Sequence, residues 1–254
     1  MPEGHLITRY ARQQEAALGG RVVRLDSPQG RFDPTPFAGR VLRDVQAHGK
    51  RLFYGFEGPG PGFIHVHLGL RGFYLHTDDP DLPARGGTRL RLTGPHDAFS
   101  LVAPMTCEAV DTATHDALVA ALGPDPLRPA EPDGAPAVRA EAVRRLVAAG
   151  APVATALTDQ SVWAGIGNAW RAELLFLAGI DPARAVTEDE AGRLWDLAVE
   201  LLEPAVEAGQ VVSDPSAPDE RWVYKRETCR RCDAPVRRWT LASRVVHACP
   251  VEQL

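Results

Sequence analysis

The hydrophobic pattern of this 254-residue chain changes near its middle, and that change limits the folds it can adopt. From Arg21 to about Val110 the sequence consists of short β-type runs separated by turn residues. The candidate strands are Arg21–Leu25, Arg40–Val45, Leu52–Phe56, Gly62–Leu68, Gly72–His76, Thr88–Leu92 and Ala98–Val102. Short strands at this spacing predict a β-sandwich or a barrel.

Helical patterns flank this β region. Residues Glu3 to Leu18 predict a helix that Gly19-Gly20 ends. A stretch rich in proline, residues 129–136, marks a boundary or hinge. The further candidate helices are Asp111–Leu122, Ala137–Ala149, Val153–Thr158, Asn168–Ala178 and Glu188–Glu207. We therefore expect an α+β protein with a β-sandwich domain over 1–123, a helical domain over 124–220 and a cysteine-rich module over 221–254.

The apolar content argues against a membrane protein and a secreted one. No apolar run approaches the roughly 18 residues that a membrane helix needs. The first residues, Met1 to His5, carry an acid in place of a basic patch, and no long apolar stretch follows. Four cysteines are too few for a disulfide scaffold. We expect a cytoplasmic protein without a membrane partner.

Charge is distributed unevenly along the chain. The net charge of the whole chain is −5, which by itself argues against nucleic-acid binding. From Arg221 to Leu254, however, eight Lys/Arg stand against three Asp/Glu, a balance of +5. A basic module on an acidic body suggests local contact with a polyanion. The alternative is an ordinary solvated charged face.

Three of the four cysteines have the spacing of zinc ligands. Cys229-x2-Cys232 is followed by sixteen residues and then Cys249. A second Cys-x2-Cys would place the fourth ligand at position 252, which is Glu252. We favour His247, because a soft thiolate site prefers imidazole to carboxylate. Such a zinc ion would be structural, whereas three unrelated reduced cysteines are the alternative.

Two further features bear on chemistry. Gly165-Ile166-Gly167-Asn168 joins two helical runs, so its backbone N–H groups suit a phosphate, although the motif by itself favours an ordinary turn capped by Asn168.

At the N-terminus, Met1 precedes the small residue Pro2, and removal of Met1 would expose a secondary amine beside Glu3. An α-amine has a pKa of about 8, so a useful fraction is a free nucleophile at neutral pH. Many proteins with no such chemistry also begin Met-Pro-Glu.

Taken together and in order, these motifs resemble the Fpg/Nei family of DNA glycosylases and AP lyases over essentially the whole chain. The matching motifs are Pro2-Glu3-Gly4, His48-Gly49-Lys50-Arg51, His67-Leu68-Gly69-Leu70, Gly123-Pro124-Asp125-Pro126-Leu127, Asp159-Gln160 before Gly165-Ile166-Gly167-Asn168, and Val223-Tyr224-Lys225-Arg226 before the cysteines. The Pro-Glu-Gly start is closer to the Nei (endonuclease VIII-like) branch. The resemblance implies a helix–two-turn–helix domain and a zinc finger.

The resemblance also implies roles for individual residues. Pro2 would be the nucleophile that forms a Schiff base with the sugar, and Glu3 the acid/base group. Lys50 would contact the phosphate at the lesion and support catalysis. Asn168 and Arg244 would bind DNA phosphates. Leu70 would be inserted into the space left by the flipped base, with Arg71 beside it. Arg244 would also support catalysis, and it would lose its scaffold if zinc were absent.

The implied activity is excision of oxidised bases, expected to be pyrimidines, followed by strand cleavage through β,δ-elimination. Damaged DNA is the expected partner, zinc the expected structural metal, and a nucleoid-associated monomer the expected state. Three alternatives stay open. The protein could be a catalytically silent zinc-finger DNA-binding protein of the same fold, an AP lyase without base excision, or an unrelated zinc-stabilised β/α protein.

Overall fold

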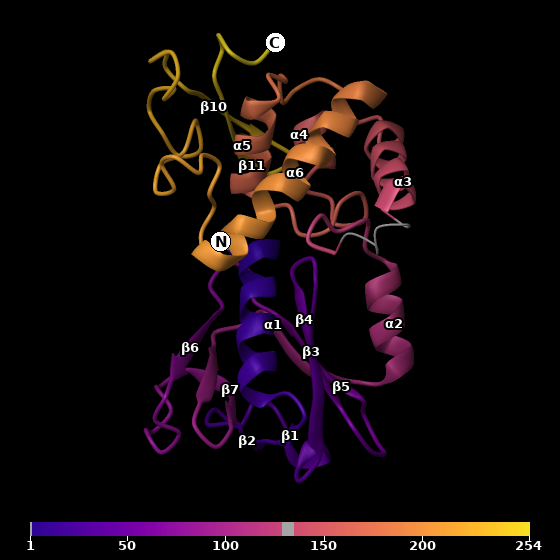
Figure 1. Ribbon diagram of the computed structural model, residues 1–254, viewed down its shortest axis with the longest axis vertical. Helices are drawn as coiled ribbons and strands as arrows, with labels where there is room; N and C mark the ends of the chain where they lie inside the picture. The colour runs from indigo at the N-terminus through magenta and orange to yellow at the C-terminus, as the bar shows by residue number, and fades with distance from the viewer. Residues whose placement is uncertain (1, 129–134) are drawn as a thin grey trace. The chain divides into compact units, whose positions relative to one another are not determined.

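The computed structural model describes residues 2–128 and 135–254, which form two compact units (Figure 1). One unit contains Pro2 and Ile7–Ala121, and the other contains Glu3–Leu6 and Leu122–Leu254. The division therefore falls inside the first helix, α1 (Gly4–Leu18). The predicted removal of Met1 and most of the proline-rich stretch at 129–136 concern residues outside the described ranges. The further split of the second unit at residue 220 stays a prediction.

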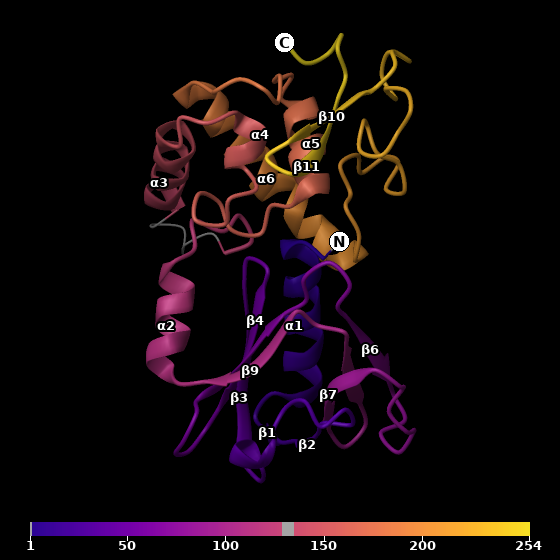
Figure 2. The ribbon, with the colours of Figure 1, turned by 180° about the vertical axis from the view of Figure 1, so that it is seen from behind.

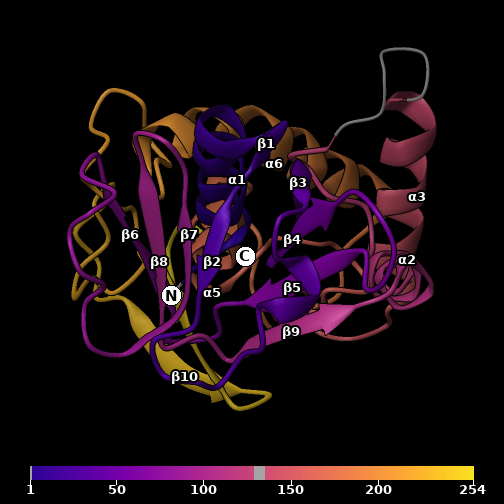
Figure 3. The same ribbon diagram turned by 90° about the horizontal axis from the view of Figure 1, so that it is seen from below.

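Nine strands in two antiparallel sheets build the first unit. The larger sheet has the order β1-β3-β4-β5-β9, and the smaller has the order β2-β7-β8-β6. Their bounds are β1 Arg21–Val22, β2 Arg24–Asp26, β3 Val41–His48, β4 Arg51–Phe56, β5 Phe63–His67, β6 Phe73–Thr77, β7 Thr88–Thr93, β8 Ala98–Val102 and β9 Thr106–Val110. Figure 3 shows the strands of the two sheets as separate groups. A short 3-10 helix, η1 (Thr35–Phe37), precedes β3.

The two sheets share one hydrophobic core, which confirms the predicted sandwich. Leu42 and Tyr54 of the larger sheet and Leu92 and Leu101 of the smaller sheet belong to a single buried cluster. Ile7 of α1 joins the same cluster. On the larger sheet, Phe53 and Phe63 form a second small cluster with residues of α2 (Thr112–Ala120). The N-terminal helix therefore completes the sandwich core.

The structure corrects the predicted strands in two places. The predicted strand Arg21–Leu25 is two strands, because the chain passes from the larger sheet to the smaller one at the buried Val23. Residues Thr106–Val110 form the edge strand β9, which was not among the predicted strands. Its inner residues show no clean alternation of buried and exposed side chains, so its pattern carries little β signal.

Helices dominate the second unit (Figure 2), and in α5 the residues from Ala169 to Phe176 are all buried. The bounds are α3 Ala135–Ala148, α4 Val153–Ala156, α5 Asn168–Leu177 and α6 Glu188–Ala208, followed by a hairpin of β10 Arg237–Leu241 and β11 Arg244–Ala248. A capping box of Thr187 and Glu190 begins α6, and Gly209 with φ 68° ends it. Trp163 and Trp170 are fully buried in the core of this unit.

None of the helices within the described ranges has the length and apolar character needed to cross a membrane.

Candidate active site at the N-terminus of helix α5

Glu3 is buried and caps a helix far away in the sequence. Its side chain is 1% exposed. The carboxylate accepts hydrogen bonds from the backbone N–H groups of Gly167 at 3.0 Å, Ala169 at 2.9 Å and Trp170 at 3.3 Å. These are the N–H groups that the first turn of a helix leaves without partners, and the helix dipole favours a negative charge there. The residue that follows Pro2 is thereby fixed to the start of α5.

Glycines make this close approach possible. A Cβ on Gly167 would lie 2.3 Å from the carboxyl carbon of Glu3, and a Cβ on Gly4 would lie 2.8 Å from the Cα of Gly165. The Gly4 N–H donates to the Gly165 carbonyl at 2.9 Å. Gly165 has φ +89°, a conformation that side chains disfavour. The two glycine-containing motifs therefore fit each other.

This contact corrects the prediction for the Gly165-Ile166-Gly167 turn. We predicted either a phosphate clamp made by its backbone or a turn capped by Asn168. The backbone N–H groups instead bind the Glu3 carboxylate, and the N-cap residue is Gly167, which has no capping side chain. The interpretation as a turn capped by Asn168 was wrong, because the capping group comes from the other end of the chain, and phosphate binding at this turn stays a prediction.

His5 adds a buried polar contact that sequence reasoning missed. Trp170 Nε1 donates to His5 Nδ1 at 3.0 Å. Burial, with a smaller contribution from Arg221, lowers the pKa of His5 to about 4, so the ring is a neutral acceptor at neutral pH. Its place two residues after Glu3, on the same helical turn, was the available signal.

Asn168 and Arg171 connect α5 to β11. The Asn168 side-chain amide donates to the Val245 carbonyl at 3.1 Å. The buried Arg171 guanidinium donates to the same carbonyl at 2.9 Å and to the Asn168 side-chain oxygen. Burial, and then the charge of Arg244, lower the pKa of Arg171 to about 10. The structure therefore brings together two predicted site residues, Asn168 and the exposed Arg244.

A second buried carboxylate, Glu173, holds the segment that leads into the cysteine-rich tail. It accepts from the backbone N–H groups of Trp222 at 2.8 Å, Val223 at 3.1 Å and Tyr224 at 2.9 Å, and from the hydroxyl of Ser213. Glu173 is 0% exposed. The sequence analysis missed it, although a lone acid within the apolar run of α5 is a usable signal.

The three cysteines meet in the tail, as their spacing predicted. The sulfurs of Cys229, Cys232 and Cys249 all lie within 4.8 Å of one another. Cys232 Sγ is 3.5 Å from Cys249 Sγ. Three sulfurs this close could hold a metal ion.

The structure does not bring His247 to this group. Its ring packs edge-on against Tyr224 with centroids 5.3 Å apart, and its buried Nδ1 has no hydrogen-bond partner within the described part of the chain. Burial lowers the pKa of His247. The structure gives no support to His247 as the fourth ligand, because ligand softness says which donor zinc prefers and not where a strand directs its side chain. The alternative ligand, Glu252, accepts a hydrogen bond at Oε2 from Arg231 Nη1 at 3.0 Å.

The remaining predicted residues lie in the first unit. Pro2 is half-buried and lies two residues before the start of α1. Lys50 follows Gly49 (φ 56°) in the tight turn between β3 and β4, where His48 pairs with Arg51. The hairpin thus holds the Lys50 backbone in one place.

Leu70 and Arg71 lie in an exposed turn after β5, and Leu70 is 66% exposed. A neighbouring apolar residue, Met105, is 67% exposed. A Cβ on Gly69 would lie only 2.8 Å from the Met105 Cβ, so the two loops touch. Leu70 and Met105 therefore form an exposed apolar tip, of which sequence reasoning found only the first.

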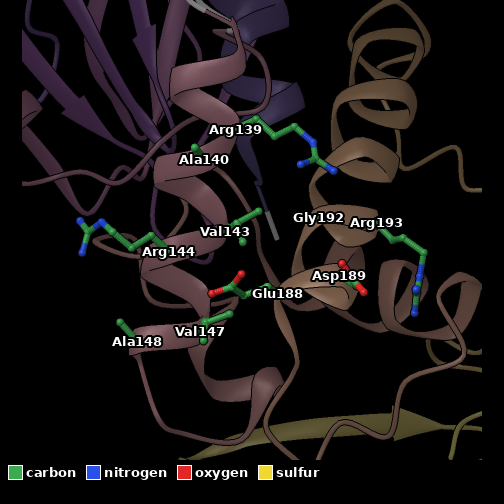
Figure 4. Close-up of a pocket in the computed structure, with 10 residues that line it drawn as sticks. All are labelled: Arg139, Ala140, Val143, Arg144, Val147, Ala148, Glu188, Asp189, Gly192 and Arg193. Carbon is green, nitrogen blue, oxygen red and sulfur yellow. The ribbon is translucent and has the colours of Figure 1, made fainter.

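A groove of about 800 Å³ lies between α3 and α6 (Figure 4). Three arginines line it, but Arg139 pairs with Asp196 and Arg144 pairs with Glu141. The groove contains none of the predicted site residues.

Comparisons with known proteins agree with these motifs. Residues 122–217 match the family model described as the Formamidopyrimidine-DNA glycosylase H2TH domain. The chain is 38% identical to Endonuclease 8 1 of Mycobacterium tuberculosis over 275 residues, covering 100% of both proteins. It is 32% identical to the DNA-(apurinic or apyrimidinic site) lyase Nei2 of Mycolicibacterium smegmatis, covering 100% of this chain and 99% of that protein.

The fold agrees as well. The crystal structure of the MutM (Fpg) protein from Thermus thermophilus superposes with a TM-score of 0.77 at 28% identity, covering 99% of this chain and 98% of that one. The N-terminal sandwich and the helical H2TH domain are thus confirmed as an Fpg-like fold. The chain belongs to the Fpg/Nei family of DNA glycosylases and AP lyases, in its endonuclease 8-like branch.

Proposed function

We propose that this protein is a bifunctional DNA glycosylase and AP lyase that excises oxidised pyrimidines and cuts the strand at the resulting site. The names of its relatives, an endonuclease 8 and an AP-site lyase, support this reaction class. The observation that carries the proposal is the buried Glu3 carboxylate on the N-terminus of α5. It fixes the chain beside Pro2, where an N-terminal amine would act.

The chemistry begins at the Pro2 amine once Met1 has been removed. Its nitrogen bonds to C1′ of the sugar while the glycosidic bond breaks, and the electron pair leaves with the base, which takes up a proton. The ring C1′–O4′ bond then opens to give an iminium ion. Loss of a C2′ proton expels the 3′ phosphate, and loss of the C4′ proton then expels the 5′ phosphate in a second elimination. Water finally hydrolyses the iminium bond and restores the Pro2 amine.

Glu3 supplies the proton transfers in this scheme. It accepts the proton from the Pro2 amine and delivers it to O4′ as the ring opens. The three N–H groups of α5 donate to its carboxyl oxygens, so the group stays oriented between transfers. Orientation of this kind contributes to rate because the group needs no rearrangement during the reaction.

Cationic and apolar groups would hold the DNA. Lys50, Asn168 and Arg244 would contact phosphates, which predicts binding that weakens steeply with salt. The exposed Leu70, with Arg71 beside it, would enter the space left by the flipped base, and the exposure of its side chain supports this role. We also propose that the protein works as a monomer on nucleoid DNA in the cytoplasm.

We further propose that the three cysteines hold a structural zinc ion. When bound, zinc would cross-link the tail and supply no step of the reaction. Cys249 follows β11 directly, so the metal would stabilise the hairpin that carries Arg244. This arrangement links metal content to DNA affinity.

Borohydride trapping tests the proposed reaction. Protein whose mass shows that Met1 is absent is incubated with DNA that contains thymine glycol or an abasic site, and wild type is compared with Pro2→Gly. We expect a covalent adduct on both substrates that the variant does not form. An adduct on the abasic site alone would reduce the activity to that of an AP lyase. No adduct on either substrate would leave a catalytically silent DNA-binding protein.

A further inference from the structure

We propose that Glu252 is the fourth ligand of the zinc ion held by Cys229, Cys232 and Cys249, and that Arg231 competes with the metal for its carboxylate. The inference rests on the zinc site of the proposed function. It concerns the one position where this chain replaces the cysteine that a second Cys-x2-Cys pair would contain.

Two turns that share one backbone hydrogen bond form the cysteine site. Cys229 and Cys249 are each followed by three turn residues. In both turns the N–H group four residues later donates to the cysteine carbonyl, from Asp233 at 2.9 Å and from Gln253 at 3.2 Å. The two segments therefore close the same type of turn over the three residues after each cysteine, although they come from different parts of the tail.

Hydrogen bonds to sulfur repeat in the same way. In the first turn the Arg231 N–H donates to Cys229 Sγ at 3.4 Å. In the second, backbone hydrogen bonds from Val251 and Glu252 reach the Cys249 thiol. N–H groups aimed at a sulfur stabilise the thiolate that binds a metal. Both turns therefore place N–H groups where they would stabilise a metal-binding thiolate.

The third residue after each cysteine then has the same place in its turn. In the first turn that residue is Cys232, whose sulfur reaches Cys249 at 3.5 Å. In the second turn it is Glu252. The backbone that presents a ligand from position 232 presents a carboxylate from position 252.

The present partner of this carboxylate lies in the opposite turn. Glu252 Oε2 accepts from Arg231 Nη1 at 3.0 Å, and Arg231 stands between Cys229 and Cys232 in the sequence. The Glu252 side chain therefore already extends from the second turn toward the first. Its side chain is 22% exposed and that of Arg231 is 43% exposed, so the ion pair is weak enough to exchange.

The chemistry of the donor set fits zinc. Structural zinc takes four ligands, and carboxylate oxygen is an accepted donor beside thiolates. Three thiolates and a carboxylate leave a net negative site, which the neighbouring arginine would offset. Arg231 keeps a place after releasing Glu252, because its guanidinium stacks over Phe176 at 4.6 Å. Among the other candidates, His247 is directed at Tyr224 instead.

Zinc affinity of the full chain, measured by competition with a chromogenic chelator, tests the inference. Glu252→Gln should weaken zinc binding by at least about tenfold, because it replaces a charged ligand. Glu252→Cys should restore or tighten it. Arg231→Gln should tighten binding by about three- to fivefold, because the competing ion pair is gone. Arg230→Gln is the matched control, since Arg230 stacks on Trp222 but pairs with Asp214.

Cobalt substitution gives a second readout that does not depend on affinity. The charge-transfer absorption of Co²⁺ reports the number of bound thiolates. The wild-type protein should show the absorption of three bound thiolates. Glu252→Cys should raise the intensity of this absorption by about one third, as expected for a fourth thiolate. Unchanged intensity in Glu252→Cys would place position 252 outside the coordination sphere and overturn the inference.

The outcomes separate this inference from the function on which it rests. Wild type that binds no zinc would refute the metal site itself, and Glu252 would have no ion to bind. Wild type that binds one zinc ion, together with unchanged affinity in both Glu252→Gln and Arg231→Gln, would refute only the role of Glu252. Tighter binding in Arg231→Gln and weaker binding in Glu252→Gln would support the inference, because a purely structural ion pair predicts the same sign for both.

Discussion

The two anchoring regions of α5 are built in different ways. At its N-terminus, Glu3 meets three backbone N–H groups, and the contact is complete with the protein's own atoms. In the tail, three sulfurs converge within 4.8 Å of one another, an arrangement that could hold a metal ion. The first region is therefore fixed by the protein's own contacts, whereas we propose that a zinc ion completes the second. We therefore expect that damage to the first region impairs catalysis and that damage to the second impairs DNA binding.

The largest expected effect comes from removing the charge at the first region. Glu3→Gln keeps an oxygen for the N–H groups of α5 but cannot exchange protons, so single-turnover excision of thymine glycol should fall about 10²- to 10⁴-fold. Zinc content and DNA affinity should stay as in wild type. A variant that also lost zinc would show that the two regions are not independent.

Acid should weaken the same region through His5. Its pKa is lowered from 6.5 to about 4 in the folded protein, so its contribution to stability is fully present above pH 6.5 and is lost as the pH falls toward 4. The loss amounts to at most about 3 kcal/mol in the free energy of unfolding. Urea unfolding of wild type and His5→Gln at pH 7.5 and 4.5 measures it. An equal pH dependence in both proteins would contradict the assignment to His5.

Zinc removal should affect the second region alone. Cys249→Ser should lose the ion and release the hairpin that carries Arg244, so duplex affinity should fall about ten- to hundredfold. The proposed chemistry at Pro2 and Glu3 should persist, visible as borohydride adducts at saturating abasic-site DNA. Cys107→Ser is the control, because Cys107 lies outside the cysteine cluster. Loss of adduct formation in Cys249→Ser at saturating DNA would contradict the claim that zinc removal leaves the chemistry at Pro2 and Glu3 intact.

The smallest effect is expected away from both regions. Leu70→Ala should slow base excision by about tenfold, because the wedge offsets lost stacking, and should change abasic-site cleavage less. Leu82→Ala removes a leucine that is also exposed, 52% against 66% for Leu70, and should have no effect. Equal losses on intact lesions and abasic sites would argue against insertion of Leu70.

The sequence predicted those parts of the fold that depend on local patterns. The strand Ala98–Val102 has the predicted bounds, and the helix predicted over Glu188–Glu207 ends one residue later. Periodicity could not show that the strand predicted at Arg21–Leu25 divides between two sheets, because alternation is the same in either sheet.

The sequence could predict several residues of the site, but it could not predict which groups they contact. Spacing identified the three cysteines, since thiolate ligands recur at short fixed intervals. No local pattern could identify the partner of Glu3, because Gly167 lies 164 residues away. Glu173 was missed for the same reason, as its three backbone donors belong to a segment about 50 residues later.

The most direct test of the account is excision by Gly167→Ala. The added methyl group has no room beside the Glu3 carboxyl carbon, at 2.3 Å, so the carboxylate must leave its position on α5. We predict at least a tenfold loss of thymine glycol excision with unchanged zinc content and circular dichroism. The control is Gly86→Ala, whose methyl group would meet nothing within 4 Å. A Gly167→Ala protein as active as wild type would contradict the claim that α5 orients Glu3 for catalysis.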